Sequence, residues 1–263
     1  MNKLLYANFK RLWKNKLFWI GMIFMFLAGL ALVLKQYEQH INYGYNVKLE
    51  STFFTYAIMI GVVSAVFCTL FTGVEYSDGT IRNKIIAGHK RTDIYFSSLI
   101  VNVSASLLFC CSYILSNIIL GISLIGLKKT GLETILILLA GSIITVIALC
   151  SIFTMVSLLV HNKALAPVIS IVGIFLLIAF TNEVQRILDQ PKTWYDGTPN
   201  LAYVEGAERE RLEFIYNALP AGQEMQYARM ETKNVGEMCV YSTGMIVLTS
   251  GIGSFIFKRK DIK

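Results

Sequence analysis

Six long stretches of this 263-residue chain contain no lysine, arginine, aspartate or glutamate. A helix rises about 1.5 Å per residue, so about 20 apolar residues cross the roughly 30 Å hydrocarbon core of a bilayer. Every backbone amide inside lipid needs an internal partner, which favours uninterrupted helices. The sequence therefore predicts an all-α, multispanning membrane protein with spans at residues 17–34, 51–74, 94–127, 134–161, 164–182 and 238–257. The third span is long enough to cross with a strong tilt, or to continue as a short interfacial piece.

The composition supports this class. Hydrophobic residues make up 55% of the chain and charged residues only 16%, whereas soluble domains carry about 25% charged residues. A disordered chain, a collagen-like repeat and a disulfide-stapled secreted module are thereby excluded. All the cysteines fall inside predicted spans, so no disulfide framework is expected outside the membrane; they are Cys68, Cys110, Cys111, Cys150 and Cys239.

The distribution of charge predicts the orientation of the chain in the membrane. An even number of spans places both termini, residues 75–93 and residues 161–163 on one face. That face carries 14 basic and 4 acidic residues, whereas the other carries 10 basic and 13 acidic residues. Basic residues in short loops mark the cytoplasmic side. We therefore expect both termini to lie in the cytoplasm, with the chain in a plasma membrane.

Residues 1–16 predict an amphipathic helix ahead of the first span. Its apolar residues recur at helical spacing and its cations occupy the remaining arc: Leu5, Phe9, Leu12 and Trp13 against Lys3, Lys10, Arg11 and Lys14. Such a helix lies in the membrane interface, near anionic headgroups. A signal that orients the first span during insertion is the alternative. A cleaved leader is disfavoured, because 18 apolar residues exceed the usual core of about 7–15.

The loop at residues 75–93 predicts a short helix. Ser77 and Asp78 favour a helix start and Gly88 favours a helix end. Between them lie an apolar edge and its basic flanks: Ile81, Ile85, Ile86, Arg82 and Lys84. This shape fits a groove on a soluble partner. A solvated basic loop that only enforces topology is the other interpretation.

This loop resembles that of the permease subunits of ATP-binding-cassette (ABC) transporters of the type 2 export superfamily. Those proteins have an acidic residue at the end of the second span, then Gly-Thr, an aliphatic residue and Arg, and later Gly and a basic residue. The chain supplies these in order: Glu75, Gly79, Thr80, Ile81, Arg82, Gly88 and Arg91. The resemblance implies that residues 75–91, with Ile85 and Ile86, contact a separate ATPase subunit. It extends over nearly the whole chain, so we expect one permease domain, residues 1–263.

Residues 183–237 form a segment too long for a simple turn. The sequence predicts an amphipathic helix around residues 201–219 and a turn at residues 220–222. The resemblance implies extracellular helices that cap the translocation path. Ten acidic residues against six basic ones could attract cationic peptides by long-range steering. A solvated cap without a binding role is the alternative.

The third predicted span carries a polar stripe. On a helical wheel its members fall within an arc of about 100°: Ser98, Asn102, Ser106, Tyr113, Ser116 and Asn117. One interpretation makes them part of a translocation surface. The other makes them helix–helix contacts, since serine and asparagine hydrogen-bond across packed spans.

Several kinds of chemistry are missing from the sequence. It has no GxxxxGK[ST] phosphate-binding loop, so ATP and Mg²⁺ are expected in a partner subunit, and no cofactor, metal or catalytic residue is expected in this chain. It has no HExxH or GxSxG motif. None of the predicted spans contains an acidic or basic residue, which disfavours an intramembrane enzyme and a proton-coupled carrier.

These features favour the permease subunit of an ATP-driven exporter. The expected partners are ABC ATPase subunits, a second permease chain in a homo- or heterodimer, and membrane lipids; nucleic acid is not expected. The resemblance to bacterial peptide export and immunity permeases implies amphipathic or antimicrobial peptides as cargo. Lipid-linked or small hydrophobic drugs are alternatives, as is a non-transporting sensor or scaffold. Replacing Ile81 or Ile85 with Asp is expected to abolish co-purification with the ATPase.

Overall fold

The computed structural model describes the chain except for residues 44–49, 125–130, 161, 163, 233 and 261–263. Most of the described residues are helical, and the single pairing of extended backbone among them joins Thr193 to Pro199. In chain order the described helices are α1 (Asn2–Lys14), α2 (Lys16–Tyr43), α3 (Glu50–Phe53), α4 (Tyr56–Ser77), α5 (Thr80–Ile86), α6 (Arg91–Leu124), α7 (Leu132–Leu159), α8 (Leu165–Leu188), α9 (Gly206–Ala218), α10 (Pro220–Arg229) and α11 (Val235–Arg259).

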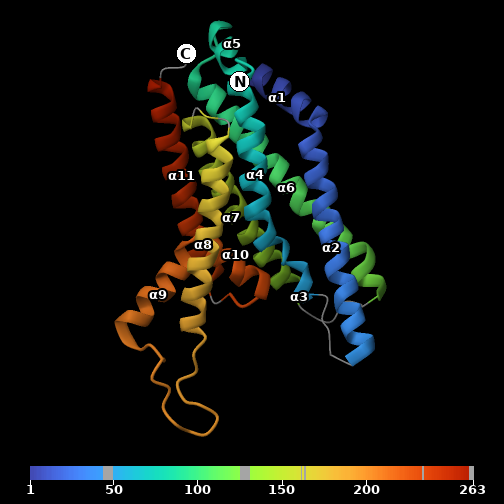
Figure 1. Ribbon diagram of the computed structural model, residues 1–263, viewed down its shortest axis with the longest axis vertical. Coiled ribbons are helices and arrows are strands. Elements are labelled where there is room, and N and C mark those ends of the chain that lie inside the picture. Colours follow the sequence, from blue (N-terminus) through green and yellow to red (C-terminus); the bar gives the residue numbers. More distant parts are fainter. Residues whose placement is uncertain (44–49, 125–130, 161, 163, 233, 261–263) are drawn as a thin grey trace.

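In the described part of the chain, six helices are long and apolar enough to cross a membrane: α2, α4, α6, α7, α8 and α11. They confirm the predicted spans and the all-α class. The start of α1, the end of α11 and α5 lie at one end of the bundle, and α9 lies at the other (Figure 1). We call these the termini end and the α9 end. The cytoplasmic placement of the termini end remains a prediction from charge, and six of the cations in that charge count lie outside the described residues: Lys48, Lys128, Lys129, Lys163, Lys233 and Lys263.

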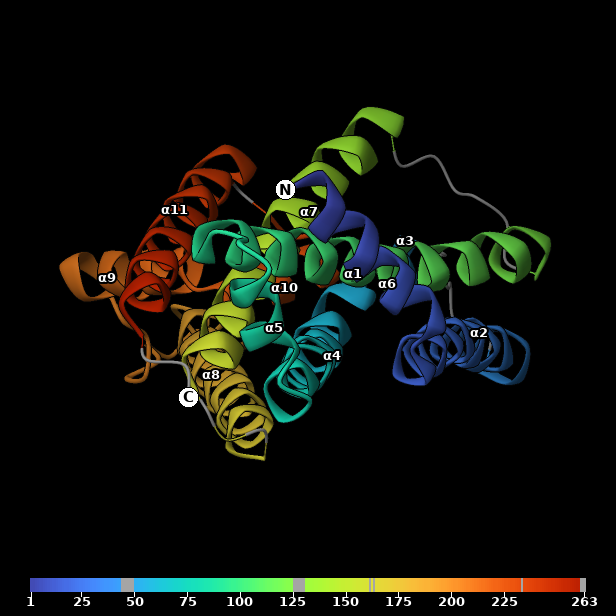
Figure 2. The same ribbon diagram turned by 90° about the horizontal axis from the view of Figure 1, so that it is seen from above.

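The bundle has a buried centre and lipid-type edges. In its most apolar window α4 is 61% buried, whereas α2 and α11 are each 22% buried. Seen from above, α2 and α11 lie at opposite edges (Figure 2). Phe67 of α4 contacts Phe109 of α6 with ring centroids 5.2 Å apart, and Phe18 of α2 lies 5.7 Å from Phe109. Aromatic packing therefore fastens the peripheral α2 to the centre.

The 34 residues of α6 correspond to a helix about 51 Å long, far more than the hydrocarbon core requires. Figure 1 shows α6 crossing the bundle obliquely. This oblique course agrees with the tilted alternative for the third span, and residues 125–127 of the predicted span lie outside the described residues.

The helix predicted at the N-terminus is present, and one of its faces is buried against the bundle, which the sequence did not predict. Leu4, Asn8 and Leu12 are the buried residues of α1, whereas Trp13 is 52% exposed. The chain bends at Asn15, whose side-chain oxygen accepts hydrogen bonds from the backbone N–H groups of Leu17 (2.8 Å) and Phe18 (3.3 Å). Because Asn15 satisfies these free amides at the start of α2, α1 can pack on α6 rather than continue α2.

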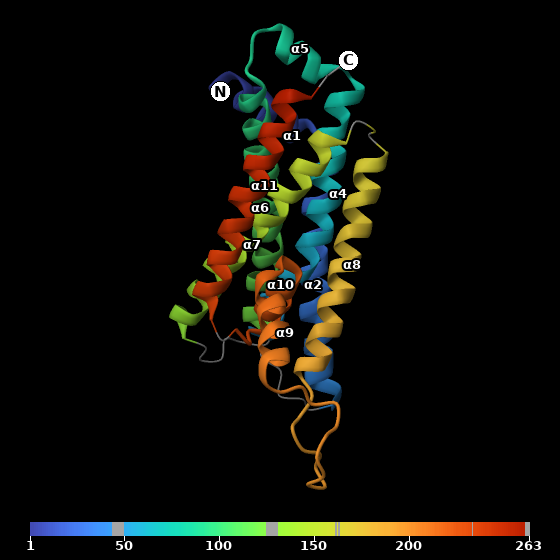
Figure 3. The ribbon, with the colours of Figure 1, turned by 90° about the vertical axis from the view of Figure 1, so that its left-hand side faces the viewer.

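The segment between the last two spans departs most from the prediction. The predicted turn at residues 220–222 is wrong, because Pro220 is the first residue of α10, a position where its missing N–H costs little. Every residue from Pro220 to Ala228 is buried. Figure 3 shows α10 inside the lower half of the bundle, between α11 and α8. The segment is therefore only partly a cap, and α10 belongs to the packed interior.

Candidate functional site at the termini end

Two glycines shape the loop that carries the predicted coupling residues. Gly79 ends the turn after α4 with φ +64°, and Gly88 follows α5 with φ +85°, a region where a residue with a side chain is strained. The Thr80 hydroxyl donates to the carbonyl oxygen of Glu75 at 3.0 Å. Ser77 and Asp78 end α4 rather than start α5, whose N-cap is Gly79. The short helix α5 therefore projects beyond the spans (Figure 3).

Glu75 is the centre of a buried ionic cluster. Its side chain is 0% exposed and pairs through Oε1 with Arg11 of α1 and with Lys84 of α5, the latter at 2.7 Å. Lys84 also donates to Asn8 Oδ1 at 3.0 Å, and Asn8 Nδ2 donates to Ser97 of α6 at 3.3 Å. We call Glu75, Arg11, Lys84 and Asn8 the Glu75 cluster. It ties α1, α5 and α6 to the end of α4.

The electrostatics of this cluster favour one arrangement of the helices. Both cations share Glu75 Oε1, while Oε2 has no hydrogen-bond partner among the described residues. The Arg11 guanidinium lies 3.9 Å over the ring of Phe71. Burial lowers the pKa of Arg11, and the neighbouring Glu75 opposes that shift. A buried ion pair adds little net stability, but removing one partner is costly, so the cluster fixes the relative positions of α1, α4 and α5.

The three isoleucines of α5 do not form the single edge that the sequence predicted. Ile81 is 1% exposed, Ile85 is partly buried beside it, and Ile86 is 73% exposed. At 100° per residue, Ile86 lies 140° around the helix from Ile81, so the two cannot share a face. Ile81 joins an apolar cluster from four other helices: Leu4, Ile94, Tyr95, Leu158 and Phe257. The prediction of one exposed apolar edge is therefore wrong, and Ile81 is a packing residue.

Arg91 also makes contacts within the chain rather than facing a partner. Its guanidinium donates to the carbonyl oxygens of Lys258 (3.3 Å) and Lys260 at the end of α11. Lys260 Nζ in turn donates to the carbonyl oxygens of Leu158 (2.8 Å) and Leu159 (3.0 Å) at the end of α7. Lys260, directly after α11, is thus fixed to the same end of the bundle as α5. No sequence pattern distinguished Lys260 from the other basic residues on this side of the membrane.

The part of α5 that does not pack against the bundle forms a small exposed face with both polar and apolar residues. Its exposed residues are Arg82, Asn83, Ile86 and Ala87, and the exposed Lys90 follows just before α6. We call these five residues the coupling face. An exposed isoleucine between cations, on a helix held from behind by Glu75 and Ile81, is suited to contact a protein partner.

The polar stripe of α6 lies between helices. All six of its members are buried. Asn102 Nδ2 donates to the hydroxyl of Thr154 on α7 (2.9 Å) and to that of Thr72 on α4 (3.3 Å). Ser106 accepts from Ser64 of α4 at 2.9 Å, and Tyr113 donates to the carbonyl oxygen of Thr52 at 2.9 Å.

The hydroxyls of Ser98 and Ser116 and the amide of Asn117 donate to backbone carbonyls of α6 itself. The bonds of Asn102, Ser106 and Tyr113 to other helices agree with the interpretation as helix–helix contacts in this conformation. A role of the stripe in a translocation surface stays a prediction.

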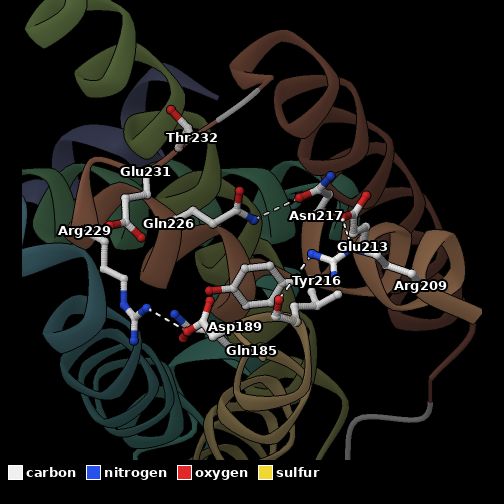
Figure 4. A pocket seen from close by; sticks show the side chains of 11 residues that line it. Gln185, Asp189, Arg209, Glu213, Tyr216, Asn217, Gln226, Arg229, Glu231 and Thr232 are labelled. Atoms are coloured by element: carbon white, nitrogen blue, oxygen red, sulfur yellow. Dashed lines mark hydrogen bonds and ion pairs between the residues drawn. The ribbon is translucent and has the colours of Figure 1, made fainter. Parts of the chain in front are cut away.

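A cavity of about 530 Å³ lies at the α9 end, between α8, α9 and α10. Figure 4 shows its ion pairs, Arg209 with Glu213 and Arg229 with Asp189, both at 3.2 Å. Tyr216 is nearly buried among them, and this burial raises its pKa to about 12. No sequence motif marked this cavity, because its residues come from three separate helices.

Residues 4–180 match the profile of a family described as ABC-2 family transporter protein. The match covers α1 to the middle of α8, and so contains the Glu75 cluster and the coupling face. The chain belongs to the ABC-2 transporter family. This ABC-2 chain is accordingly a membrane permease component of an ABC exporter, and the ATPase of such an exporter resides in a separate subunit. A search of curated proteins found no match.

Proposed function

We propose that this ABC-2 permease exports amphipathic or antimicrobial peptides, driven by ATPase subunits that dock on the coupling face. The observation that carries the docking part is the contrast within α5. Ile86 is 73% exposed while Ile81, five residues earlier, is 1% exposed. An exposed apolar residue on a firmly held helix can bind a partner, and a movement of that partner then displaces the helix and the residues packed behind it.

The contacts of α5 provide the path for that movement. A displacement of α5 acts through Ile81 on the apolar cluster contributed by α1, α6, α7 and α11. It acts through Lys84 on Glu75 and hence on α4 and α1. ATP-driven closure of two ATPase subunits would shift the permease between inward- and outward-open states, provided that they bind one state better than the other. Two permease chains, alike or related, would surround the path.

The cargo proposal is supported by the α9 end. The segment from residue 183 to 237 has ten acidic and six basic residues. The 530 Å³ cavity there presents arginines, carboxylates and side-chain amides, which are groups that hydrogen-bond peptides. A specific observation favours hydrophobic drugs or lipid-linked cargo as the second candidate. It is an apolar pocket of about 410 Å³ between α6 and α7, bounded by Leu107, Ile114 and Val146 among others.

The docking proposal is tested by two isoleucine variants. We expect Ile86→Asp to leave the melting temperature of the purified permease unchanged and to abolish co-purification with the ATPase. Ile81→Asp should instead destabilise the permease, because it buries a carboxylate in an apolar cluster. Ile41→Asp is a matched control, since Ile41 is 61% exposed near the far end of α2. An Ile86→Asp permease that keeps both its ATPase and its transport would contradict the proposal.

The cargo is tested in a strain that lacks the permease gene. Sensitivity to cationic amphipathic peptides that is restored by the wild-type gene and not by Ile86→Asp supports peptide export. Unchanged peptide sensitivity combined with a raised sensitivity to hydrophobic drugs favours the second candidate. An isolated complex whose ATP hydrolysis responds to neither would favour a non-transporting sensor or scaffold.

A further inference from the structure

The helix α10 is held inside the bundle by one glutamine. Gln223 Nε2 donates to the carbonyl oxygens of Asn217 (2.8 Å) and Met238 (3.1 Å). Its Oε1 accepts from the hydroxyls of Thr145 on α7 and Ser242 on α11, both at 2.6 Å. All four hydrogen-bonding positions of this amide are used, so α10 has one well-defined seated position.

The next residue, Glu224, is buried without a partner. Its side chain is 2% exposed, and neither carboxyl oxygen has a hydrogen bond or ion pair among the described residues. The carboxyl lies against Gly61 of α4, where a Cβ would sit 3.0 Å from Oε2 and 3.1 Å from Oε1. Ile174 of α8 borders the same space. Glu224 therefore occupies a tight notch in which a side chain at position 61 would press on its carboxyl.

No cation faces Glu224 in the described part of the chain. The titratable groups that act on it are the thiols of Cys150 on α7 and Cys110 on α6. α4 presents the Gly61 backbone and α8 presents Ile174. The side chains of α3 that the structure describes, Thr52 and Phe53, are uncharged.

The charged residues at the ends of the neighbouring helices pair elsewhere. Arg229 of α10 pairs with Asp189, Arg209 of α9 pairs with Glu213, and Glu183 of α8 pairs with Arg186. An ionised carboxylate in such surroundings is strongly disfavoured. Burial accordingly raises the pKa of Glu224 well above its ordinary value, and the nearby Gly61 backbone opposes this shift only in part.

The two faces of α10 meet very different surroundings. Glu224 and Gln226 lie 200° apart around the helix. Glu224 points to the Gly61 notch, whereas Gln226 lines the 530 Å³ polar cavity (Figure 4). Glu224 and this cavity are therefore on opposite sides of a single helix. A rotation or outward shift of α10 would carry the carboxyl from the dry interior to water.

We propose that Glu224 is a proton-binding site whose occupancy is coupled to the seating of α10. With α10 seated, the carboxyl is protonated. When α10 moves toward the cavity, the carboxyl meets water and releases its proton there, and reseating takes a proton back from the same side. The proton site follows from the packing of α10 alone. Its consequence, an outer gate that closes more firmly at low pH, rests on the proposed function.

The direction of the pH dependence follows from linkage. Glu224 has a higher pKa with α10 seated than with α10 exposed, so the exposed state binds fewer protons at neutral pH. The seated state is fully favoured below the ordinary glutamate pKa. That advantage is lost as the pH rises through the raised pKa of the seated state.

The test is an infrared comparison of the full chain in lipid nanodiscs, without an ATPase. We expect the wild-type spectrum at neutral pH to contain the carbonyl stretch of a protonated carboxylic acid, which Glu224→Gln removes and which alkaline pH converts to a carboxylate signal. Glu231→Gln is the matched control, because Glu231 is an exposed acid just after α10, and it should remove only a carboxylate signal at neutral pH.

Thermal unfolding provides the second readout. The melting temperature of the wild type should fall from mildly acidic to mildly alkaline pH, and Glu224→Gln should flatten this dependence. A carboxylate signal from Glu224 at neutral pH, or the same pH dependence in both chains, would overturn the proposal. Should Glu224→Gln not fold, Gly61→Ala presses on the same carboxyl and must shift the carbonyl band, and an unshifted band would overturn the proposal as well. Because no ATPase is present, a failure of docking at α5 cannot produce or hide these results.

Discussion

Two glutamates show how differently this bundle treats a buried carboxyl. Glu75 has two cations on one oxygen, and Glu224 has none among the described residues. Glu75 pairs with both cations and fixes the positions of helices, since removing either partner leaves a buried charge without its counter-charge. Glu224 avoids a charge by holding a proton, as we infer. Only the family resemblance pointed to Glu75, and its partner Arg11 was expected near lipid headgroups.

The contrast predicts the cost of neutralising Glu75. Glu75→Gln leaves Arg11 and Lys84 without their counter-charge, and we expect it to destabilise the permease by about 2–3 kcal/mol. This is less than the roughly 3–5 kcal/mol typical of a fully buried pair, because the cations are 30% and 15% exposed. Thermal unfolding in detergent measures it. Asp78→Asn, an exposed change in the same loop, should have little effect, and equal melting temperatures for both variants would contradict the cluster's role.

Glu224 could not have been found from the apolar stretches. Glu224 lies outside every charge-free stretch, because α10 is a polar segment that folds back among the spans. The sequence does contain one signal for this helix. Pro220 is followed by nine residues that include no further proline and only one glycine, Gly222, and such a stretch permits a helix that begins at proline. Burial of that helix depends on contacts with α4, α7 and α8, which one sequence does not reveal.

At the scale of elements, the sequence predicted which segments are helical better than it predicted which residues of each helix point inward. The long spans follow from run length alone, because lipid leaves the backbone no other option. The seven residues of α5 make fewer than two turns, too few for periodicity to decide which isoleucines point inward. The inward stripe of α1 is Leu4, Asn8 and Leu12, and its polar Asn8 was not counted as part of an apolar face.

The docking of α10 predicts an asymmetry between two glycines in spans. A Cβ on Gly141 of α7 would meet the Tyr227 hydroxyl at 2.5 Å and Val235 at 2.8 Å, whereas none of the described atoms lies within 4 Å of a Cβ on Gly173 of α8. Gly141→Ala should therefore cost about 1–3 kcal/mol through overpacking. Gly173→Ala should be neutral or mildly stabilising. The free energy of unfolding in detergent measures both, and equal values would show that α10 is not seated against α7.

At the scale of the whole molecule, the termini end and the α9 end carry different features. The coupling face, the Glu75 cluster and the end of α11 gather at one end, and the polar cavity and α10 gather at the other (Figures 1 and 4). The number of spans and their order were predictable from sequence. The hydrogen bonds of the α6 stripe to Thr72 and Thr154 were not, because they depend on which spans become neighbours.

The predicted orientation has a direct test. Tyr195 is fully exposed in the loop before α9, and Arg82 is exposed on α5. In a chain without native cysteines, we expect Tyr195→Cys to react with a membrane-impermeant maleimide on intact cells. Arg82→Cys should react only after the cells are permeabilised. The reverse pattern would place the coupling face outside the cell and contradict the proposed function.

The central claim is that a separate ATPase drives this permease through α5, and site-directed cross-linking tests it most directly. The complex would carry a single cysteine, Ile86→Cys, with Ile81→Cys and Tyr195→Cys as buried and far-end controls. The account predicts that Ile86→Cys cross-links to the ATPase subunit, with a yield that changes between nucleotide-free and ATP-bound complexes, and that both controls do not cross-link. Cross-linking at Tyr195→Cys, or none at Ile86→Cys in a complex that still transports, would contradict it.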